Sequence, residues 1–208
     1  PLLFIMALLP MTETLNNTGL GYQYDRSHKI NHLLYMDDLK LFAKSQDEVD
    51  KLVRKVHEVS EDIKMEFGIP KCGTLTIKRG QVTATEGIDL NGTKIQDIDE
   101  QGYKYLGVLE HDNFLHQQMK ENITKEYLKR LRLILKSHLN GGNTITAINA
   151  WAVPVIRYGA GIINWTQLER QNLDRKTRKL LTIHRALHPR SCVDRLYVKR
   201  KEGGRSLI

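Results

Sequence analysis

The chain has 208 residues, of which 40% are hydrophobic and 27% are charged, and its formal net charge is +8 at pH 7. This length and hydrophobic content suffice for one domain, or two small ones, with a sizeable core. The only cysteines are Cys72 and Cys192, which excludes a disulfide framework and favours a reducing compartment.

Charge is distributed unevenly along the chain. Residues 1–119 contain 13 Lys and Arg against 18 Asp and Glu, a balance of −5, whereas residues 120–208 contain 19 against 6, a balance of +13. An acidic first part and a strongly basic second part favour a metal-binding body joined to a polyanion-binding arm. The alternative is a basic helical domain whose charges are only solvated.

The first residues form an apolar run, 1–10, that is too short to span a bilayer and predicts a buried helix. A chain that opens at Pro1 rather than at Met is expected to be a fragment. After a loop at 16–19, residues 21–24 predict a short strand and residues 25–28 a polar turn.

Two adjacent carboxylates, Asp37 and Asp38, interrupt an apolar run at 33–43. Residues 33–36 predict a strand and residues 39–43 its return, so the aspartates fall at the turn of a hairpin. Ionised carboxylates beside an apolar sheet are costly to desolvate, and a divalent cation such as Mg²⁺ would relieve that cost. The alternative is ordinary turn chemistry, in which each Asp caps its own loop.

Further elements follow in order. Ser45 and Glu48 predict a capping box that opens a helix ending at Gly68. Its apolar face comprises Val49, Leu52, Val53, Val56, Val59, Ile63 and Phe67. A loop with Lys71 leads to a strand at 74–77, hairpin turns at 78–81 and 90–93, and a strand at 103–108.

From about residue 113 the apolar residues recur at the spacing of an α-helix. The apolar positions of the first helix are Met119, Ile123, Tyr127, Leu131, Ile134, Leu135 and Leu139, and Asn140-Gly141-Gly142 is expected to end it. A second, mostly buried helix covers 145–156 with a kink at Pro154, and a third begins with a capping box at Thr166 and ends at His188-Pro189.

The segment Tyr35-Met36-Asp37-Asp38 resembles the catalytic hairpin of reverse transcriptases, and its flanks resemble those of non-LTR (LINE-type) retrotransposons. Residues 1–4 are similar to the end of the template-contacting helix motif, and residues 186–205 to the linker after the thumb. The segment 103–108 resembles the primer grip, although an aromatic strand ending in Gly is also typical of a core.

This resemblance implies an α+β fold, in which an antiparallel palm sheet with packed helices precedes an α-helical thumb. The palm part would cover 1–111, the thumb 112–189 and a basic linker 190–208. The implied activity is RNA-directed DNA polymerase, with RNA template, DNA primer and deoxynucleoside triphosphates as partners. The implied location is the nucleus or cytoplasm, without secretion or a membrane partner.

The resemblance also assigns roles to residues. Asp37 would be the principal ligand of Mg²⁺, or of Mn²⁺ in its place, with Asp38 a secondary ligand or electrostatic partner. Lys71 would protonate the pyrophosphate leaving group, or is merely a solvated loop lysine. Nucleic acid would be contacted by Tyr35, Met36, Tyr105, Leu106, Gly107, Lys125, Lys129, Arg132 and Lys136.

A further metal-binding aspartate and the fingers would lie before Pro1, in the remainder of the polyprotein. The isolated chain is therefore expected not to polymerise. Two rival hypotheses remain: a non-catalytic nucleic-acid-binding remnant of such an element, and a structural hairpin protein without a polymer partner.

Overall fold

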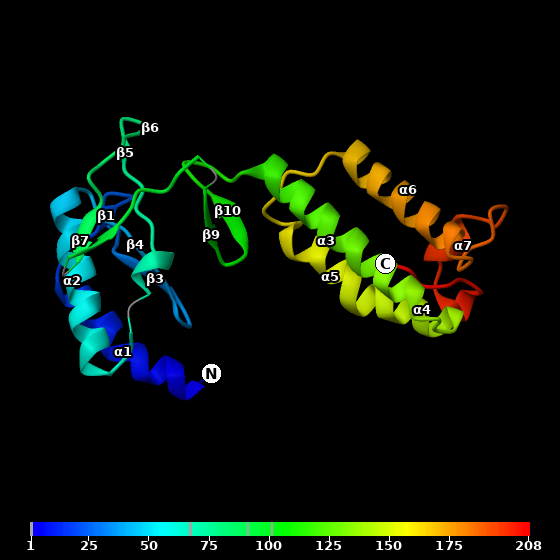
Figure 1. The fold of residues 1–208 in the computed structure, drawn as a ribbon, viewed down its shortest axis with the longest axis horizontal. Coiled ribbons are helices and arrows are strands. Elements are labelled where there is room, and N and C mark those ends of the chain that lie inside the picture. Colours follow the sequence, from blue (N-terminus) through cyan, green and yellow to red (C-terminus); the bar gives the residue numbers. More distant parts are fainter. Residues whose placement is uncertain (1, 67, 91, 101) are drawn as a thin grey trace. The chain divides into compact units, whose positions relative to one another are not determined.

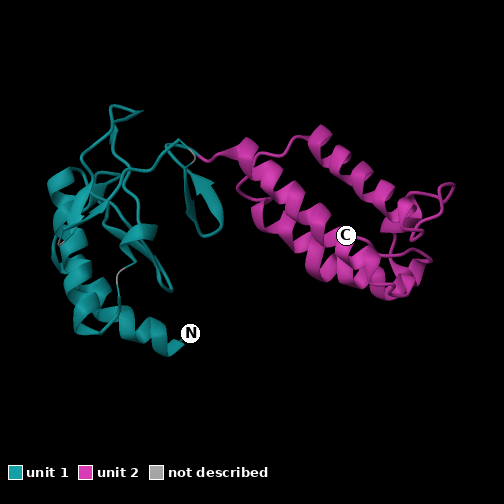
Figure 2. Ribbon diagram, viewed as in Figure 1, with its two compact units in different colours: residues 1–113 teal, residues 114–208 magenta. Residues whose placement is uncertain are grey.

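The computed structural model describes residues 2–66, 68–90, 92–100 and 102–208. It is a mixed α+β structure of helices and short antiparallel strand pairs (Figure 1), which is the predicted class. The chain divides into two compact units, residues 1–113 and 114–208 (Figure 2). The division predicted from the sequence followed residue 111, and residues 190–208 were predicted as a separate linker, whereas in the structure these last residues belong to the second unit.

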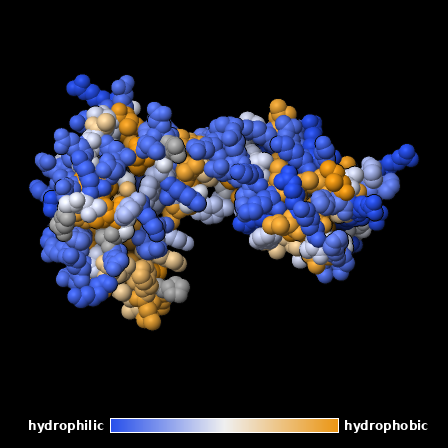
Figure 3. Space-filling view, viewed as in Figure 1, coloured by the Kyte–Doolittle hydropathy of each residue, from blue (hydrophilic) through white to orange (hydrophobic). Residues whose placement is uncertain are grey.

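The first unit opens with helix α1, Leu2–Asn17, which continues past Pro10. Its buried residues are Leu8, Met11 and Leu15. The expectation of a buried helix is wrong for most of the first half, because the side chains of Leu2, Leu3, Ile5, Met6 and Leu9 are exposed, and Figure 3 shows apolar atoms gathered over this end of α1. Pro1, part of the predicted helix, lies outside the described residues.

The described strands form five separate antiparallel pairs rather than one palm-like sheet. The pairs are β1 (Tyr22–Gln23) with β2 (Lys29–Ile30), β3 (His32–Tyr35) with β4 (Asp38–Leu41), β5 (Ile77–Lys78) with β6 (Gln81–Val82), β7 (Ile88–Leu90) with β8 (Thr93–Ile95), and β9 (Tyr103–Tyr105) with β10 (Val108–Glu110).

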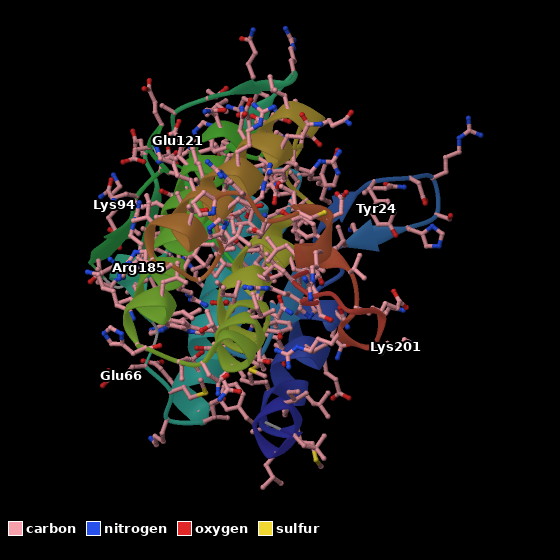
Figure 4. All side chains as sticks on the ribbon, turned by 90° about the vertical axis from the view of Figure 1, so that its right-hand side faces the viewer. Tyr24, Glu66, Lys94, Glu121, Arg185 and Lys201 are labelled. Atoms are coloured by element: carbon pink, nitrogen blue, oxygen red, sulfur yellow. The ribbon has the colours of Figure 1, made fainter. Side chains whose placement is uncertain are left out.

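Two of these strand pairs can be compared directly with the sequence predictions. The polar turn between β1 and β2 is confirmed, since the Asp25 carboxylate accepts from the backbone N–H groups of Ser27 and His28, each at 2.7 Å. Tyr24, which is labelled in Figure 4, stacks on His28 in this hairpin. The strand predicted at 74–77 is reduced to Ile77 in β5 and a single bridge from Thr74 to Asp97. Asn91, in the predicted turn 90–93, lies outside the described residues.

Helix α2, Gln46–Asp62, begins as predicted but ends earlier. The Ser45 side chain accepts from the backbone N–H of Glu48, which forms one half of the expected capping box. The helix stops because Lys64 adopts a left-handed conformation, with φ of 58°, and Met65 donates back to the Ser60 carbonyl. Phe67, placed on this helix from the sequence, lies outside the described residues. The short 3-10 helix η1, Ile69–Lys71, follows.

Helix α2 joins two apolar clusters of the first unit. Leu52 and Val56 pack with the buried residues of α1, while Val53 packs with Ile88, Leu90 and Ile95 of the β7–β8 pair. Each of these side chains contributes about 1.5–3 kcal/mol by leaving water. Leu34, Leu39 and Leu41 lie at the edge of the α1 cluster and anchor the β3–β4 hairpin to it.

The second unit is helical. Its elements are α3 (His116–Lys136), α4 (Gly141–Ala147), the π-helical turn η2 (Ile148–Ala152), α5 (Val153–Gly159), α6 (Gln167–Ile183), α7 (Asp194–Tyr197) and the 3-10 helix η3 (Arg200–Glu202). Among the described residues, no helix combines the length and apolar character that a bilayer crossing requires.

The buried face predicted for α3 is confirmed for Met119, Ile123, Tyr127, Leu131 and Ile134. Its predicted end is wrong. The helix stops at Lys136, with His138 in a left-handed conformation, and Asn140 instead caps α4 by accepting from the backbone N–H of Asn143 at 2.9 Å.

The other two predicted helices also show local differences. The second one contains the π-helical turn η2, which ends two residues before Pro154, because the proline lacks an N–H for the regular ladder. The capping box of Thr166 and Glu169 at the start of α6 is confirmed. Helix α6 ends at Ile183 rather than at His188, because Arg185 takes a positive φ of 59°.

The final segment, 190–208, packs on the helical core. Leu196 and Leu207 are buried in the same cluster as Leu131, Ile148 and Leu181. Three arginines of the segment, Arg195, Arg200 and Arg205, donate to the backbone carbonyls of Gly203, Gly142 and Ala186. These arginines therefore hold the segment in place as well as adding charge.

Candidate active site and nucleic-acid interface

The tip of the β3–β4 hairpin carries the two adjacent aspartates. Tyr35 pairs with Asp38, so Met36 and Asp37 form a two-residue turn. Met36 has φ of 53°, a left-handed conformation that a residue with a side chain adopts only at some energetic cost. Strain of this kind is often found at functional sites, where the surrounding structure maintains it.

The register separates the two faces of the hairpin. Leu34 and Leu39 form a cross-strand pair on the face that packs on the core. Since successive side chains alternate, Tyr35, Asp38 and Lys40 share the other face. The amino-acid pattern thus directs Asp38 away from the apolar core.

Both carboxylates are exposed, as are Tyr35 and Met36 with exposed fractions of 58% and 42%. The predicted desolvation cost is wrong, because the pair lies at the solvated tip rather than inside the apolar sheet. A cation is therefore not required to make the hairpin stable. The pair remains accessible to a solvated metal ion or a phosphate.

A second hairpin, β9–β10, lies beside the first. The Lys40 ammonium forms an ion pair with Glu110 at 2.5 Å and lies 5.1 Å from the centre of the Tyr105 ring. The Lys40 and Glu110 side chains are only 34% and 20% exposed. The contact joins segments that are far apart in the sequence and places Tyr105 next to the strand that carries Asp38.

The pKa values of both tyrosines of β9 are raised by this environment. Partial burial raises the pKa of Tyr105, and the negative charges of Asp38 and Glu110 raise it further. Burial likewise raises the pKa of Tyr103, with smaller contributions from Cys72, Asp38 and Glu110. The Asp38 carboxylate is thus close enough to influence both phenols.

Lys71 reaches this region through its backbone. The Tyr103 hydroxyl donates to the Lys71 carbonyl oxygen at 3.0 Å. The side chain of Lys71 is exposed. The β9–β10 hairpin thus contacts both the strand that follows the acid pair, through Lys40, and the Lys71 carbonyl, through Tyr103.

The predicted strand at 103–108 is wrong as a continuous element. Leu106 and Gly107 form the two-residue turn of the β9–β10 hairpin, with φ of 45° and 80°. Two successive positive values are typical of the type I′ turn, which matches the twist of paired strands. Of the predicted primer-grip residues, Tyr105 contacts the β3–β4 hairpin through the Lys40 ammonium.

Three neighbours of the acid pair were not predicted as site residues: Lys40, Tyr103 and Glu110. Lys40 could have been found, because it lies two residues after Asp38 and strand alternation places it on the same face. Glu110 could not, since its proximity depends on how one hairpin packs on another.

The donor chemistry of the tip suits a hard divalent cation. Mg²⁺ is usually held by one or two protein carboxylates and completes its shell with water and phosphate oxygens. Asp37 and Asp38 supply two carboxylates at an exposed turn. Over the described ranges, no group of three or more His, Cys, Asp or Glu side chains is placed to hold a metal ion. Asp37 and Asp38 therefore fit as two of the ligands of a divalent cation, but they do not form a complete set.

In the second unit, the four predicted nucleic-acid contacts lie on one face of α3. Lys125, Lys129, Arg132 and Lys136 are exposed and separated by four, three and four residues, which places them in a stripe along the helix. We call these four residues the α3 stripe. It lies opposite the buried face of the helix.

Most charges of the α3 stripe are uncompensated. Lys129 approaches Glu126 at 3.8 Å, and for Lys125, Arg132 and Lys136 the described part of the chain shows no ion pair. Arg130, just outside the stripe, is instead held by Glu126 at 2.8 Å and lies over the Trp151 ring. A row of free cations on a helix can follow a phosphate backbone without reading sequence.

A scan against known protein families found no match to this chain, and a search of curated proteins found none.

Proposed function

We propose that the chain is part of an RNA-directed DNA polymerase of the non-LTR retrotransposon type. In this proposal the first unit is the C-terminal part of the palm, the second unit is the thumb, and residues 190–208 correspond to the segment after it. The observation that supports it most is the exposed acid pair at a strained hairpin tip, with Tyr105 against Lys40 of the same hairpin.

The proposed roles follow from the positions of the side chains. Asp37 and Asp38 would hold Mg²⁺, or Mn²⁺, which in nucleotidyl transfer neutralises charge on the triphosphate. Tyr35 and Met36, exposed at the tip, would contact the primer end. Lys71 would donate a proton to the leaving pyrophosphate from its exposed ammonium.

Two carboxylates do not complete a two-metal centre. We therefore propose that a further acidic ligand comes from polypeptide outside the described residues and that this chain alone does not extend a primer. The α3 stripe would bind the backbone of the template–primer duplex, which explains why a free row of cations is useful there.

Primer extension on an RNA template tests the proposal. The assay would use a longer polypeptide that adds the proposed acidic ligand to this chain, with Mg²⁺ and all four deoxynucleoside triphosphates. Asp37→Asn and Asp38→Asn are each expected to reduce extension at least a hundredfold, whereas Asp62→Asn on α2 should leave it unchanged. Extension that survives both hairpin substitutions would remove the pair from the reaction.

A second candidate function is a nucleic-acid-binding remnant without catalysis. The α3 stripe favours it, because it requires no metal and no further polypeptide. The two candidates differ in the same assay: the remnant binds duplex with a steep salt dependence and shows no extension even in the longer polypeptide.

A further inference from the structure

The second unit contains a cavity that the proposed polymerase function does not use. It has a volume of about 700 Å³ and opens to solvent between helices α3, α5, α6 and α7. This volume lies within the range of small-molecule sites, which are often found between the helices of a bundle. Every residue that lines it belongs to the second unit.

The body of the cavity is apolar. Its walls include Val153, Ile156, Ile163, Leu173 and Leu207. A polar pair at the lining, Tyr127 and Thr177, is already satisfied, because the two hydroxyls bond to each other at 2.9 Å. A ligand that fills this space therefore needs an apolar body and gains little from polar groups along it.

Among the described residues, three donor groups at the cavity have no acidic or hydrogen-bonding partner. The Trp165 indole nitrogen is buried and lacks a hydrogen bond. Arg157 and Arg170, from α5 and α6, also line the cavity, and the described residues show no acidic partner for either guanidinium. A buried N–H and two free guanidinium groups are complementary to one carboxylate.

The acidic residue of the lining is already engaged. The Asp174 carboxylate accepts from the Tyr197 hydroxyl and forms an ion pair with Arg178 at 3.0 Å. Its charge is thus partly balanced by neighbours, and the excess at the cavity is positive.

We infer that this cavity binds a small amphipathic carboxylate, with the apolar body among the helices and the acid group at Arg157, Arg170 and the Trp165 indole. A nucleotide fits less well, because its sugar and base would bury polar groups against the apolar walls. The site is independent of the acid pair and of the α3 stripe.

Trp165 itself provides the measurement. The chain has two tryptophans, so Trp151→Phe leaves Trp165 as the only one. In this background, titration with decanoate is expected to change Trp165 fluorescence saturably, with one ligand per chain. Decanol, which has the same chain length but no charge, should bind at least tenfold more weakly, since it loses the charge-assisted hydrogen bonds.

Amino-acid substitutions can test the arginines and the apolar cavity separately. Arg157→Gln with Arg170→Gln should weaken decanoate at least tenfold, whereas Arg175→Gln, on α6 but outside the cavity, should have no effect. Ala160→Phe fills the cavity and should abolish binding, with circular dichroism reporting that the helices remain. Equal binding of decanol and decanoate, insensitivity to the arginine changes, or the absence of saturation would each overturn the inference.

Discussion

Lys40 on β4 pairs with Glu110 on β10 and thereby joins the hairpin of the acid pair to the hairpin of Tyr105. The two residues are 70 positions apart, and both side chains are largely shielded from water. In the proposed enzyme this contact would keep Tyr105 near the metal-binding tip. Its strength can be measured separately from catalysis.

A double-mutant cycle with Lys40→Met and Glu110→Gln should give a coupling free energy of about 1 kcal/mol, because the pair is half-buried. The readout is amide hydrogen exchange of β4 and β10, which reports opening of the two hairpins. The exposed pair Lys55 and Glu58 on α2 is the control, and its coupling should be near zero. Equal coupling in the two cycles would mean that the hairpins are not joined by this contact.

Met36→Gly should stabilise the β3–β4 hairpin by about 1 kcal/mol, since glycine adopts the positive φ without steric cost. If Met36 contacts the primer end, the same change should lower primer extension by the longer polypeptide. Slower hydrogen exchange of β3 and β4 together with reduced extension is the expected combination. Met36→Gly with unchanged extension would assign Met36 to the turn alone.

Each charge removed from the α3 stripe should reduce the salt dependence of duplex binding. For Lys129→Gln and Arg132→Gln, we expect the slope of log affinity against log salt to fall by about 0.9 per substitution. Lys201→Gln, which removes the same charge from η3 (Figure 4), serves as the control. If all three variants change the slope equally, binding follows net charge and not the stripe.

We expect acid to lower the free energy of unfolding of the second unit, because Glu169 becomes protonated. Its pKa is lowered from 4.5 to about 2, first by the Thr166 backbone N–H and then by Lys120. Because the folded-state pKa is the lower one, this stabilisation is complete above about pH 4.5 and is lost as the pH falls toward about 2. Urea unfolding followed by tryptophan fluorescence at about pH 6 and about pH 3 measures it.

The Glu169→Gln variant should lose part of this pH dependence, whereas Glu121→Gln on the exposed face of α3 should keep it. An identical decrease between the two pH values in wild type and Glu169→Gln would show that other groups cause the acid sensitivity.

Short-range sequence patterns predicted where the helices begin and which faces are buried, but they did not predict where the helices end. The capping residues Ser45 and Thr166 and the apolar period of α3 were readable, because each depends on residues within a few turns. The stops at Lys64, His138 and Arg185 were not, since left-handed residues other than glycine carry no clear sequence signal.

In the candidate site, too, features set by local sequence were predictable and features set by tertiary packing were not. The hairpin followed from its apolar flanks, but its turn lies at Met36 and Asp37, one residue before the predicted turn at Asp37 and Asp38. The α3 stripe followed from helical spacing. The exposure of the acid pair and the second turn at Leu106 were missed, because they depend on tertiary packing and on the register of β9 with β10. The exposed half of α1 was missed for the same reason.

Paramagnetic relaxation by Mn²⁺ tests the central claim most directly, because it locates a divalent ion on the chain itself. Substoichiometric Mn²⁺ should broaden the NMR signals of Asp37 and Asp38 first and those of Tyr105 next, and Asp37→Asn should remove this effect. Uniform broadening, or stronger broadening at another acidic segment such as Asp97, would contradict the assignment of the hairpin tip as the metal-binding centre.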